Sequence, residues 1–244
     1  MEAFKDFYCE IDPSKENIKD EISRILKIAF IPKYSKRPPR ILLLGPPSSG
    51  KTTIAELLAK RYRLTLVSAG NLLEEEIKGK TVKGQIAIEL MEKGEEVSDK
   101  VMGKIVEERL NQPDCKVNGW VLEGFPLNEA QARILKQERH TPSTVIELGI
   151  SDEAAFERSE SKRIDPTTGK VYSLTNEDLK PSKEIEANLI TKECDSYDKV
   201  EKKLEMWKTF KDKINEFYKG KLAPISAEKP IEAVLEAISD EVEN

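Results

Sequence analysis

The sequence predicts an α/β fold in which short buried strands alternate with amphipathic helices around one parallel sheet. Several short apolar runs lack polar alternation, which is typical of parallel strands buried on both faces. The segments between these runs repeat apolar residues at helical spacing. In addition, the first strand leads into a glycine-rich loop that opens directly into a helix. These three observations together predict a layered fold with a phosphate-binding loop near its start.

The loop follows the apolar run 41–44 and precedes the helical pattern of Ile54, Ala55, Leu57 and Leu58. Its residues match G-x-x-x-x-G-K-[ST], and strand, loop and helix stand in the order that this motif needs. A flexible surface turn with a solvated lysine is the alternative, and the two flanks disfavour it. The candidate ATP-binding residues are Gly45, Pro46, Pro47, Ser48, Ser49, Gly50, Lys51, Thr52 and Thr53.

The chemistry of this loop follows from its backbone. Gly45 and Gly50 can take φ values closed to other residues, so that successive amides turn inward around an anion at the positive end of the helix. Lys51 is expected to reach the β- and γ-phosphates, and the Thr52 hydroxyl is expected to face Mg²⁺ carried by the nucleotide.

The remaining elements continue the alternation along the chain. Further strands are predicted at 64–67, 120–122, 145–150 and 222–226. Helices are predicted at 84–92, 128–138 and 195–218. Two more are predicted to begin after Asn71 and Asp152 as N-caps, and a further two to start at Ser98 and Pro230.

An acidic residue, Glu123, ends the strand at 120–122. Such a residue is the second element of a phosphate-loop protein, because it holds Mg²⁺ or the water around it. A solvated carboxylate that merely ends a strand is the alternative. The loop at 45–52 favours the metal role.

A basic helix end carries Arg158, Lys162 and Arg163, and it leads to Gly169, which suggests a turn between two short strands. This arrangement suits a lid over phosphates. The alternative is that the cations simply stabilise a helix C-terminus.

Residues 1–39 differ from the rest. Residues 18–29 form one amphipathic helical pattern, and Pro32, Pro38 and Pro39 favour an extended linker after it. The helix either packs on its own domain or docks to a protein partner.

Composition limits the function classes. The 244 residues have a net charge of −5 and a pI near 5.4, which disfavours nucleic acid and anionic lipid as partners. Cys9, Cys115 and Cys194 are widely separated, which argues against disulfides or a cysteine zinc site and favours a reducing, cytoplasmic location. No apolar run approaches the ~18 residues that span a bilayer, and no signal peptide is expected.

A family resemblance covers residues 40–237. The segments GPPSSGKTT, SAGNLL, GEEVSD, GWVLEGFPLNEAQA and RIDPTTGKVY resemble, in order and spacing, the adenylate kinase family of nucleoside monophosphate kinases. Two of them, extended to GPPSSGKTTIA and KRIDPTTGKVY, look most similar to the domains of the eighth human-type isoform, a class associated with cilia and flagella.

The resemblance implies a P-loop NTPase fold with five parallel strands over residues 40–244. It implies an insert at 68–97 that binds the nucleoside monophosphate, abbreviated NMP, and a lid insert of the long type at 161–198. The implied reaction is in-line transfer of the γ-phosphoryl from Mg-ATP to a monophosphate, with positioning and cationic side chains supplying the catalysis. A monomer is the family default.

The resemblance also implies roles for single residues. Arg158 occupies the position that stacks on the ATP adenine. Lys51, Lys162 and Lys192 are the candidate catalytic cations. The candidate NMP-binding residues are Ala69, which replaces the usual threonine, Leu73, Val97, Met102, Gly124 and Gln131, of which Gln131 usually hydrogen-bonds adenine.

Several positions depart from the family pattern. Glu74 and Leu127 replace the two arginines that normally hold the acceptor phosphate, and Glu201 replaces another arginine. Lys162 and Lys192 keep the charge of lid-side arginines without the bidentate fork. The usual aspartate pair in the lid becomes Cys194 and Asp195, and the usual Walker-type aspartate is Glu123.

Three hypotheses follow. The first is a working kinase, AMP-directed, in which Lys78, Lys80 or Lys83 replaces the missing cations. The second is a nucleotide-binding pseudokinase with a structural or regulatory role, for example in a cilium. The third is an ATPase or a kinase for another small molecule, which leaves the match at Gln131 unexplained.

Overall fold

A computed structural model describes residues 38–93, 95–168, 170–176, 179–191 and 196–243. The predicted helix within residues 1–39 lies outside these ranges. Among the described residues, no helix is both long and apolar enough to cross a bilayer.

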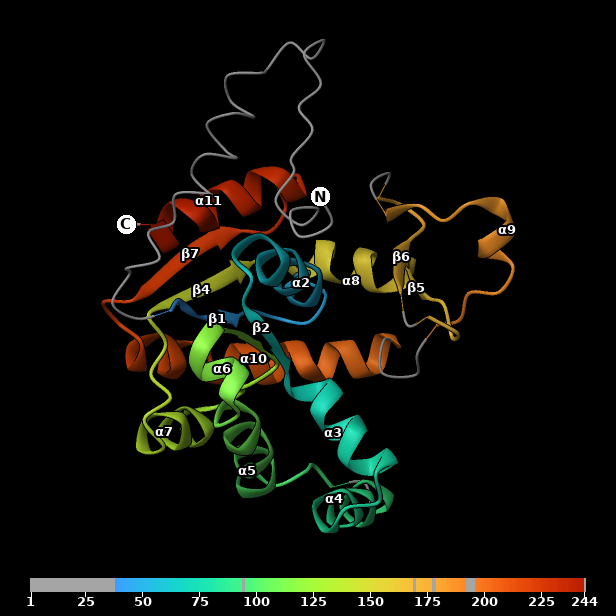
Figure 1. The fold of residues 1–244 in the computed structure, drawn as a ribbon. Helices are drawn as coiled ribbons and strands as arrows, with labels where there is room; N and C mark the ends of the chain where they lie inside the picture. The colour runs from blue at the N-terminus through green and yellow to red at the C-terminus, as the bar shows by residue number, and fades with distance from the viewer. Residues whose placement is uncertain (1–37, 94, 169, 177–178, 192–195, 244) are drawn as a thin grey trace, which may run out of the picture. The chain divides into compact units, whose positions relative to one another are not determined.

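The described chain is built on a five-stranded parallel sheet (Figure 1), which confirms the predicted fold class. The strand order is β2-β3-β1-β4-β7. The strands are β1 (Arg40–Leu44), β2 (Thr65–Ser68), β3 (Trp120–Glu123), β4 (Thr144–Gly149) and β7 (Leu222–Ser226). The first strand in the chain therefore lies in the middle of the sheet, where the loop that follows it is surrounded by other strand ends.

Helices connect the strands and cover the sheet. They are α2 (Lys51–Tyr62), α3 (Ala69–Lys78), α4 (Val82–Glu92), α5 (Asp99–Leu110), α6 (Pro113–Asn118), α7 (Glu129–Gln137), α8 (Asp152–Ser161), α9 (Lys183–Glu186), α10 (Tyr197–Phe217) and α11 (Ile231–Glu243). Figure 1 shows α11 and α10 on opposite sides of the sheet.

The two faces of the sheet bury separate apolar cores. Alternate residues of β1 divide between them: Ile41 and Leu43 pack with the helices α2 and α11, whereas Leu42 and Leu44 pack with α5, α7 and α10. All four side chains are at most 2% exposed. Each contributes about 1.5–3 kcal/mol by leaving water. The uninterrupted apolar run of β1 is thus explained by burial on both sides.

Most predicted boundaries lie within two residues of the observed ones, but two caps differ and one helix was not predicted. Helix α3 begins at Ala69 after Ser68, so Asn71 is an interior residue and the predicted Asn71 cap is wrong. The cap of α8 is Ser151, whose Oγ accepts from the Ala154 amide, so the Asp152 cap is wrong by one position. Helix α6, which starts at Pro113, was not predicted because its six residues are too few to show a helical period.

A small peripheral hairpin follows α8. Strands β5 (Lys162–Ile164) and β6 (Val171–Ser173) pair antiparallel, as the turn signal predicted, although Gly169 itself lies outside the described residues. Asp165 shapes the turn, because its carboxylate accepts from the Thr167 amide at 2.9 Å and the Thr168 hydroxyl at 2.6 Å. Ile164 also forms an isolated bridge with Ile190.

Candidate functional site

The glycine-rich loop lies between β1 and α2, at the carboxyl edge of the sheet. Gly50 is the N-cap of α2 with φ 84° and ψ 16°, and no side chain caps this helix end. Gly45 has φ 148°, and a Cβ there would lie 2.7 Å from the Leu148 carbonyl oxygen. Both glycines are therefore required by the backbone, and the first amides of α2 remain available for an anion.

Lys51 folds back into this loop. Its ammonium donates to the Gly45 carbonyl at 2.9 Å and to the Pro46 carbonyl at 2.6 Å. Burial lowers the pKa of Lys51 to about 8, while the Glu123 carboxylate acts in the opposite direction. At neutral pH the side chain is still mostly protonated, so that it can act as the point charge that a triphosphate requires.

Glu123 and Thr52 are the predicted magnesium residues. Glu123 is buried at the last position of β3, where the Ser68 hydroxyl at the end of the neighbouring strand donates to its carboxylate. Thr52 lies exposed in the first turn of α2. A hydroxyl and a carboxylate fit Mg²⁺, which takes oxygen ligands and keeps several of its waters.

Two further lysines approach Lys51. Lys162 at the start of β5 and Lys203 on α10 both lower the pKa of Lys51 through their charges. Lys162 was predicted as a candidate and Lys203 was not. The sequence contains no signal that separates Lys203 from the other lysines of this charged helix. On the same helix, the family resemblance points instead to Glu201, which stands at the position of a family arginine and is exposed.

Arg158 near the end of α8 and Arg163 in β5 make different contacts. The Arg158 side chain extends from α8 toward β7, where its Nη2 donates to the Ala227 carbonyl at 2.6 Å, directly after the end of that strand. Arg163 instead donates to the carbonyls of Glu160 at 2.7 Å and Lys162 at 2.8 Å. Arg163 therefore caps the end of α8, whereas Arg158 is held where a planar group could lie on a base.

Gln131, a predicted NMP-binding residue, is the centre of a buried hydrogen-bond network. Its Oε1 accepts from the Leu127 amide at 2.7 Å, and its Nε2 donates to Asp99 Oδ1 at 2.8 Å. Asn128, the N-cap of α7, donates to the same Asp99 oxygen at 3.0 Å. Asp99 was missed by sequence reasoning, although its place directly after the Ser98 cap of α5 within GEEVSD was a usable signal.

The other candidate base-contact residues come from several elements. Ala69 is buried at the start of α3, and a Cβ at Gly124 would lie 3.6 Å from the Ala69 side chain. Met102 on α5 packs against the core, and Leu73 and Val97 are partly buried. The structure thus brings Ala69 and Gly124 together, and Leu73 follows Ala69 by four residues on the same helix.

The positions expected to hold the acceptor phosphate carry no arginine. Leu127 is 52% exposed, and the Glu74 carboxylate lies 3.5 Å from the Lys78 ammonium on the surface of α3. Lys192, Cys194 and Asp195 lie outside the described residues.

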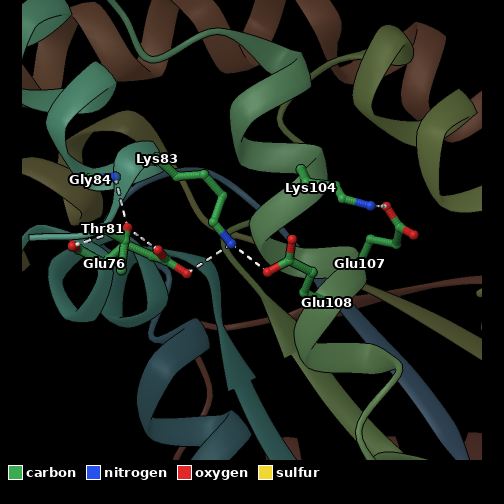
Figure 2. Close-up of polar contacts among 7 residues, drawn as sticks. All are labelled: Glu76, Thr81, Lys83, Gly84, Lys104, Glu107 and Glu108. Atoms are coloured by element: carbon green, nitrogen blue, oxygen red, sulfur yellow. Dashed lines mark hydrogen bonds and ion pairs between the residues drawn. The ribbon is translucent and has the colours of Figure 1, made fainter. Parts of the chain in front are cut away.

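Lys83, one of the lysines predicted to replace the missing cations, forms ion pairs with two carboxylates. Figure 2 shows its ammonium between Glu76 of α3 and Glu108 of α5, and the distance to Glu76 is 3.1 Å. Thr81 completes this group, because its hydroxyl donates to the Glu76 carboxylate and accepts from the Gly84 amide at 3.1 Å. These contacts tie α4 to its two neighbours. We name the group of Glu76, Thr81, Lys83 and Glu108 the Lys83 clasp.

Comparison with known proteins agrees with the geometry. The family model of adenylate kinase matches residues 43–223. The chain is 35% identical over 203 residues to "Adenylate kinase, chloroplastic" of Zea mays, covering 83% of this chain and 91% of the relative. It is 36% identical over 197 residues to "Probable adenylate kinase 2, chloroplastic" of Oryza sativa subsp. japonica, covering 81% and 67%.

A third relative is "Adenylate kinase 8" of Homo sapiens, with 38% identity over 169 residues, or 69% of this chain and 35% of that protein. The family match spans the glycine-rich loop, the strands β2, β3 and β4, the end of β1, the start of β7, and the Asp99–Gln131 network. The chain therefore belongs to the adenylate kinase family of nucleoside monophosphate kinases.

Proposed function

We propose that this chain transfers the γ-phosphoryl group of Mg-ATP to AMP, at a rate lowered by the altered acceptor site. The proposed catalytic domain is 40–244, with an NMP-binding insert at 68–97 and a lid at 161–198. One observation carries the proposal: an intact phosphate loop holds Lys51 within electrostatic reach of Glu123, Lys162 and Lys203.

On the donor side, each of the chain's own residues has a physical task. The amides at the start of α2 bind the phosphate tail, and Lys51 compensates its charge. Thr52 and Glu123 would hold the magnesium ion, which neutralises charge on the β- and γ-oxygens when bound. Lys162 and Lys203 would stabilise the charge of the moving phosphoryl group, and Arg158 would lie against the adenine.

On the acceptor side, the orientation of Gln131 supports AMP. Because its Oε1 accepts from the Leu127 amide and one Nε2 hydrogen goes to Asp99, the second Nε2 hydrogen remains to be donated. Adenine N1 and cytosine N3 accept such a hydrogen bond. The corresponding ring positions of guanine and uracil carry a hydrogen and would face this donor with another donor.

The lowered rate is supported by the residues at the phosphate end. Glu74 and Leu127 supply no positive charge there, and Glu74 adds a negative one. One charge-stabilising contact is worth about 3–4 kcal/mol in a transition state, or a few hundredfold in rate. Lys78 and Lys80 are the remaining candidate replacements on the insert.

A coupled assay of ADP formation from ATP with AMP, CMP, UMP and GMP tests the proposal. Lys51-dependent turnover, highest with AMP, is the expected result. No transfer to any of the four acceptors, with ATP binding retained, would contradict it. In that case the second candidate, a nucleotide-binding pseudokinase with a structural or regulatory role, would be favoured by the exposed Leu127 and the Glu74–Lys78 pair. Transfer to a different small molecule would favour another kinase.

The proposed setting follows from the sequence features. We place the protein in the cytoplasm because its three cysteines are widely separated in the sequence. A cilium or flagellum is the finer alternative that the similarity to adenylate kinase 8 supports. We further propose that residues 1–39 supply a helix that packs on the domain or binds a partner, and that the catalytic unit is a monomer. Imaging of the tagged chain and light scattering test these points.

A further inference from the structure

A cavity lies at the opposite edge of the sheet from the phosphate loop. Its volume is about 280 Å³, and it is bordered by the first residues of β1 and β3 and by the ends of α5, α6 and α7. Arg40 begins β1, whereas Gly45 follows its other end, so that the strand separates the two sites by about 15 Å. This cavity therefore belongs to neither the donor nor the acceptor side of the reaction.

The lining of the cavity is strongly basic. Arg40, Lys116, Arg139 and His140 contribute to it, against the single carboxylate of Glu138. In the part of the chain that the structure describes, no ion pair involves Arg40, Lys116 or Arg139. Some positive charge at the ends of α6 and α7 offsets the helix dipoles, but Arg40 stands on a strand and has no such role.

Two buried nitrogen atoms at this place lack partners among the described residues, and both are donors once the imidazole is protonated. The Nε atom of Arg40 and the Nε2 atom of His140 are both buried, and neither has a hydrogen-bond partner within the described ranges. His140 is 8% exposed. Buried polar groups without partners are uncommon and costly, so that an acceptor supplied from outside would be stabilised here.

The backbone holds these side chains in place. Arg40 exchanges hydrogen bonds with Ser143, because its amide donates to Ser143 Oγ at 2.9 Å and its carbonyl accepts from the Ser143 amide at 2.8 Å. Arg139 has φ 61°, which turns the chain sharply after α7, and the His140 amide donates to the Leu135 carbonyl at 2.9 Å. Arg40 and Lys116 come from a strand and a helix, and Arg139 and His140 come from the short turn after α7.

We propose that this cavity binds a small tetrahedral oxyanion, namely inorganic phosphate or the phosphate group of a small ester. Several cationic donors around one space match the several acceptor oxygens of such an ion. Burial lowers the pKa of His140 most, and the charges of Arg40 and Lys116 lower it further, whereas the Glu107 carboxylate acts in the opposite direction. A bound anion would raise this pKa. His140 is thus a built-in reporter, since it is the single histidine of the chain.

The test is an NMR titration of the His140 imidazole in the full, untagged chain. Two samples keep added phosphate out of the phosphate loop. In the first, saturating Mg-ADP occupies the loop; in the second, Lys51→Ala weakens the loop without any nucleotide being added. In both, inorganic phosphate is expected to raise the pKa of His140 by about one unit in a saturable way. Sodium chloride at equal ionic strength is expected not to do so.

Matched variants locate the effect. Arg40→Gln, Lys116→Gln and Arg139→Asn each remove one charge from the cavity. Because Lys116 and Arg139 are exposed, their substitutions are not expected to disturb folding. Each is expected to weaken the phosphate response at least severalfold. Arg133→Gln, on the exposed face of α7 and paired with Glu129, removes the same charge outside the cavity and is expected to leave the response unchanged.

A second titration uses glycerol 3-phosphate. Tighter binding than phosphate would identify an ester as the ligand, and weaker binding would identify the free ion. An equal shift in sodium chloride, or a phosphate response that survives all three cavity substitutions, would overturn the proposal. Because the Lys51→Ala background needs no working donor site, a failure of the proposed kinase activity would not be mistaken for a failure of this site.

Discussion

The donor and acceptor halves of the candidate site differ in what they are made of. The donor half is made mainly of backbone, in which glycine geometry, a central strand and a helix start place the amides. In the proposed acceptor half, by contrast, single side chains from separate elements would hold the phosphate. The family resemblance implies arginines at two of these positions, where this chain has Glu74 and Leu127 while keeping the five-stranded sheet. A backbone site is retained as long as the fold is, whereas a side-chain site can be lost one residue at a time.

The largest expected effect is in the donor half. Lys51→Ala is expected to lower turnover by about a hundredfold to a thousandfold, because it removes the buried cation of the phosphate loop. The coupled ADP assay measures this loss. Lys60→Ala, an exposed residue in the last turn of the same helix, is the matched control and should retain full turnover. Equal loss in both variants would contradict a special role for Lys51.

Restoring cations in the acceptor half should produce the opposite result. Leu127→Arg, alone and combined with Glu74→Arg, is expected to raise kcat/KM for AMP by about tenfold to a hundredfold, since each adds a charge where the acceptor phosphate is proposed to lie. Ala130→Arg, exposed on α7, is the control for added charge. If the double variant is no faster than the control, then the missing arginines do not limit the rate.

The pKa of Lys51 makes nucleotide binding dependent on pH. In the free protein it is about 8, and bound phosphates would raise it by favouring the charged form. Above pH 8, binding therefore takes up a proton, and the affinity for ATP should fall by up to about tenfold per pH unit. Calorimetry in two buffers of different ionisation enthalpy detects this proton. The same uptake in Lys51→Ala would assign it to another group.

Asp99→Ala tests the base end of the acceptor half. It removes the partner that orients Gln131, so that the KM for AMP is expected to rise by about tenfold while the KM for ATP stays unchanged. Steady-state kinetics with each nucleotide varied separately checks this. A proportional rise in both KM values would indicate a general structural defect instead.

The smallest expected effect concerns the Lys83 clasp. Lys83→Met removes a cation shared by two carboxylates and is expected to lower the melting temperature by about 2–4 °C. Lys104→Met breaks a single exposed pair with Glu107 (Figure 2) and should have less effect. A loss of AMP binding in Lys83→Met without any loss of stability would indicate that Lys83 binds the phosphate of AMP.

Much of the fold could be predicted from short-range patterns. Apolar runs located all five strands of the sheet, and the loop motif located the donor site, because both depend on residues close together in the chain. Lys203 could not be assigned in this way, because its role depends on α10 meeting other elements. Asp99 was missed although it directly follows the Ser98 cap, and its hydrogen bond to Gln131 depends on α5 meeting α7. The caps at Asn71 and Asp152 were misplaced for a local reason, since each lies close to the serine that precedes the helix.

The close approach at Gly45 has a practical consequence for mutagenesis. A side chain at this position would push against the Leu148 carbonyl and so separate two neighbouring strands of the sheet. An inactive Gly45 variant would then report damage to the scaffold as well as loss of ligand affinity. Inactivating substitutions meant to isolate nucleotide recognition should accordingly be made at a side-chain position, and glycine replacements should be interpreted together with an unfolding curve.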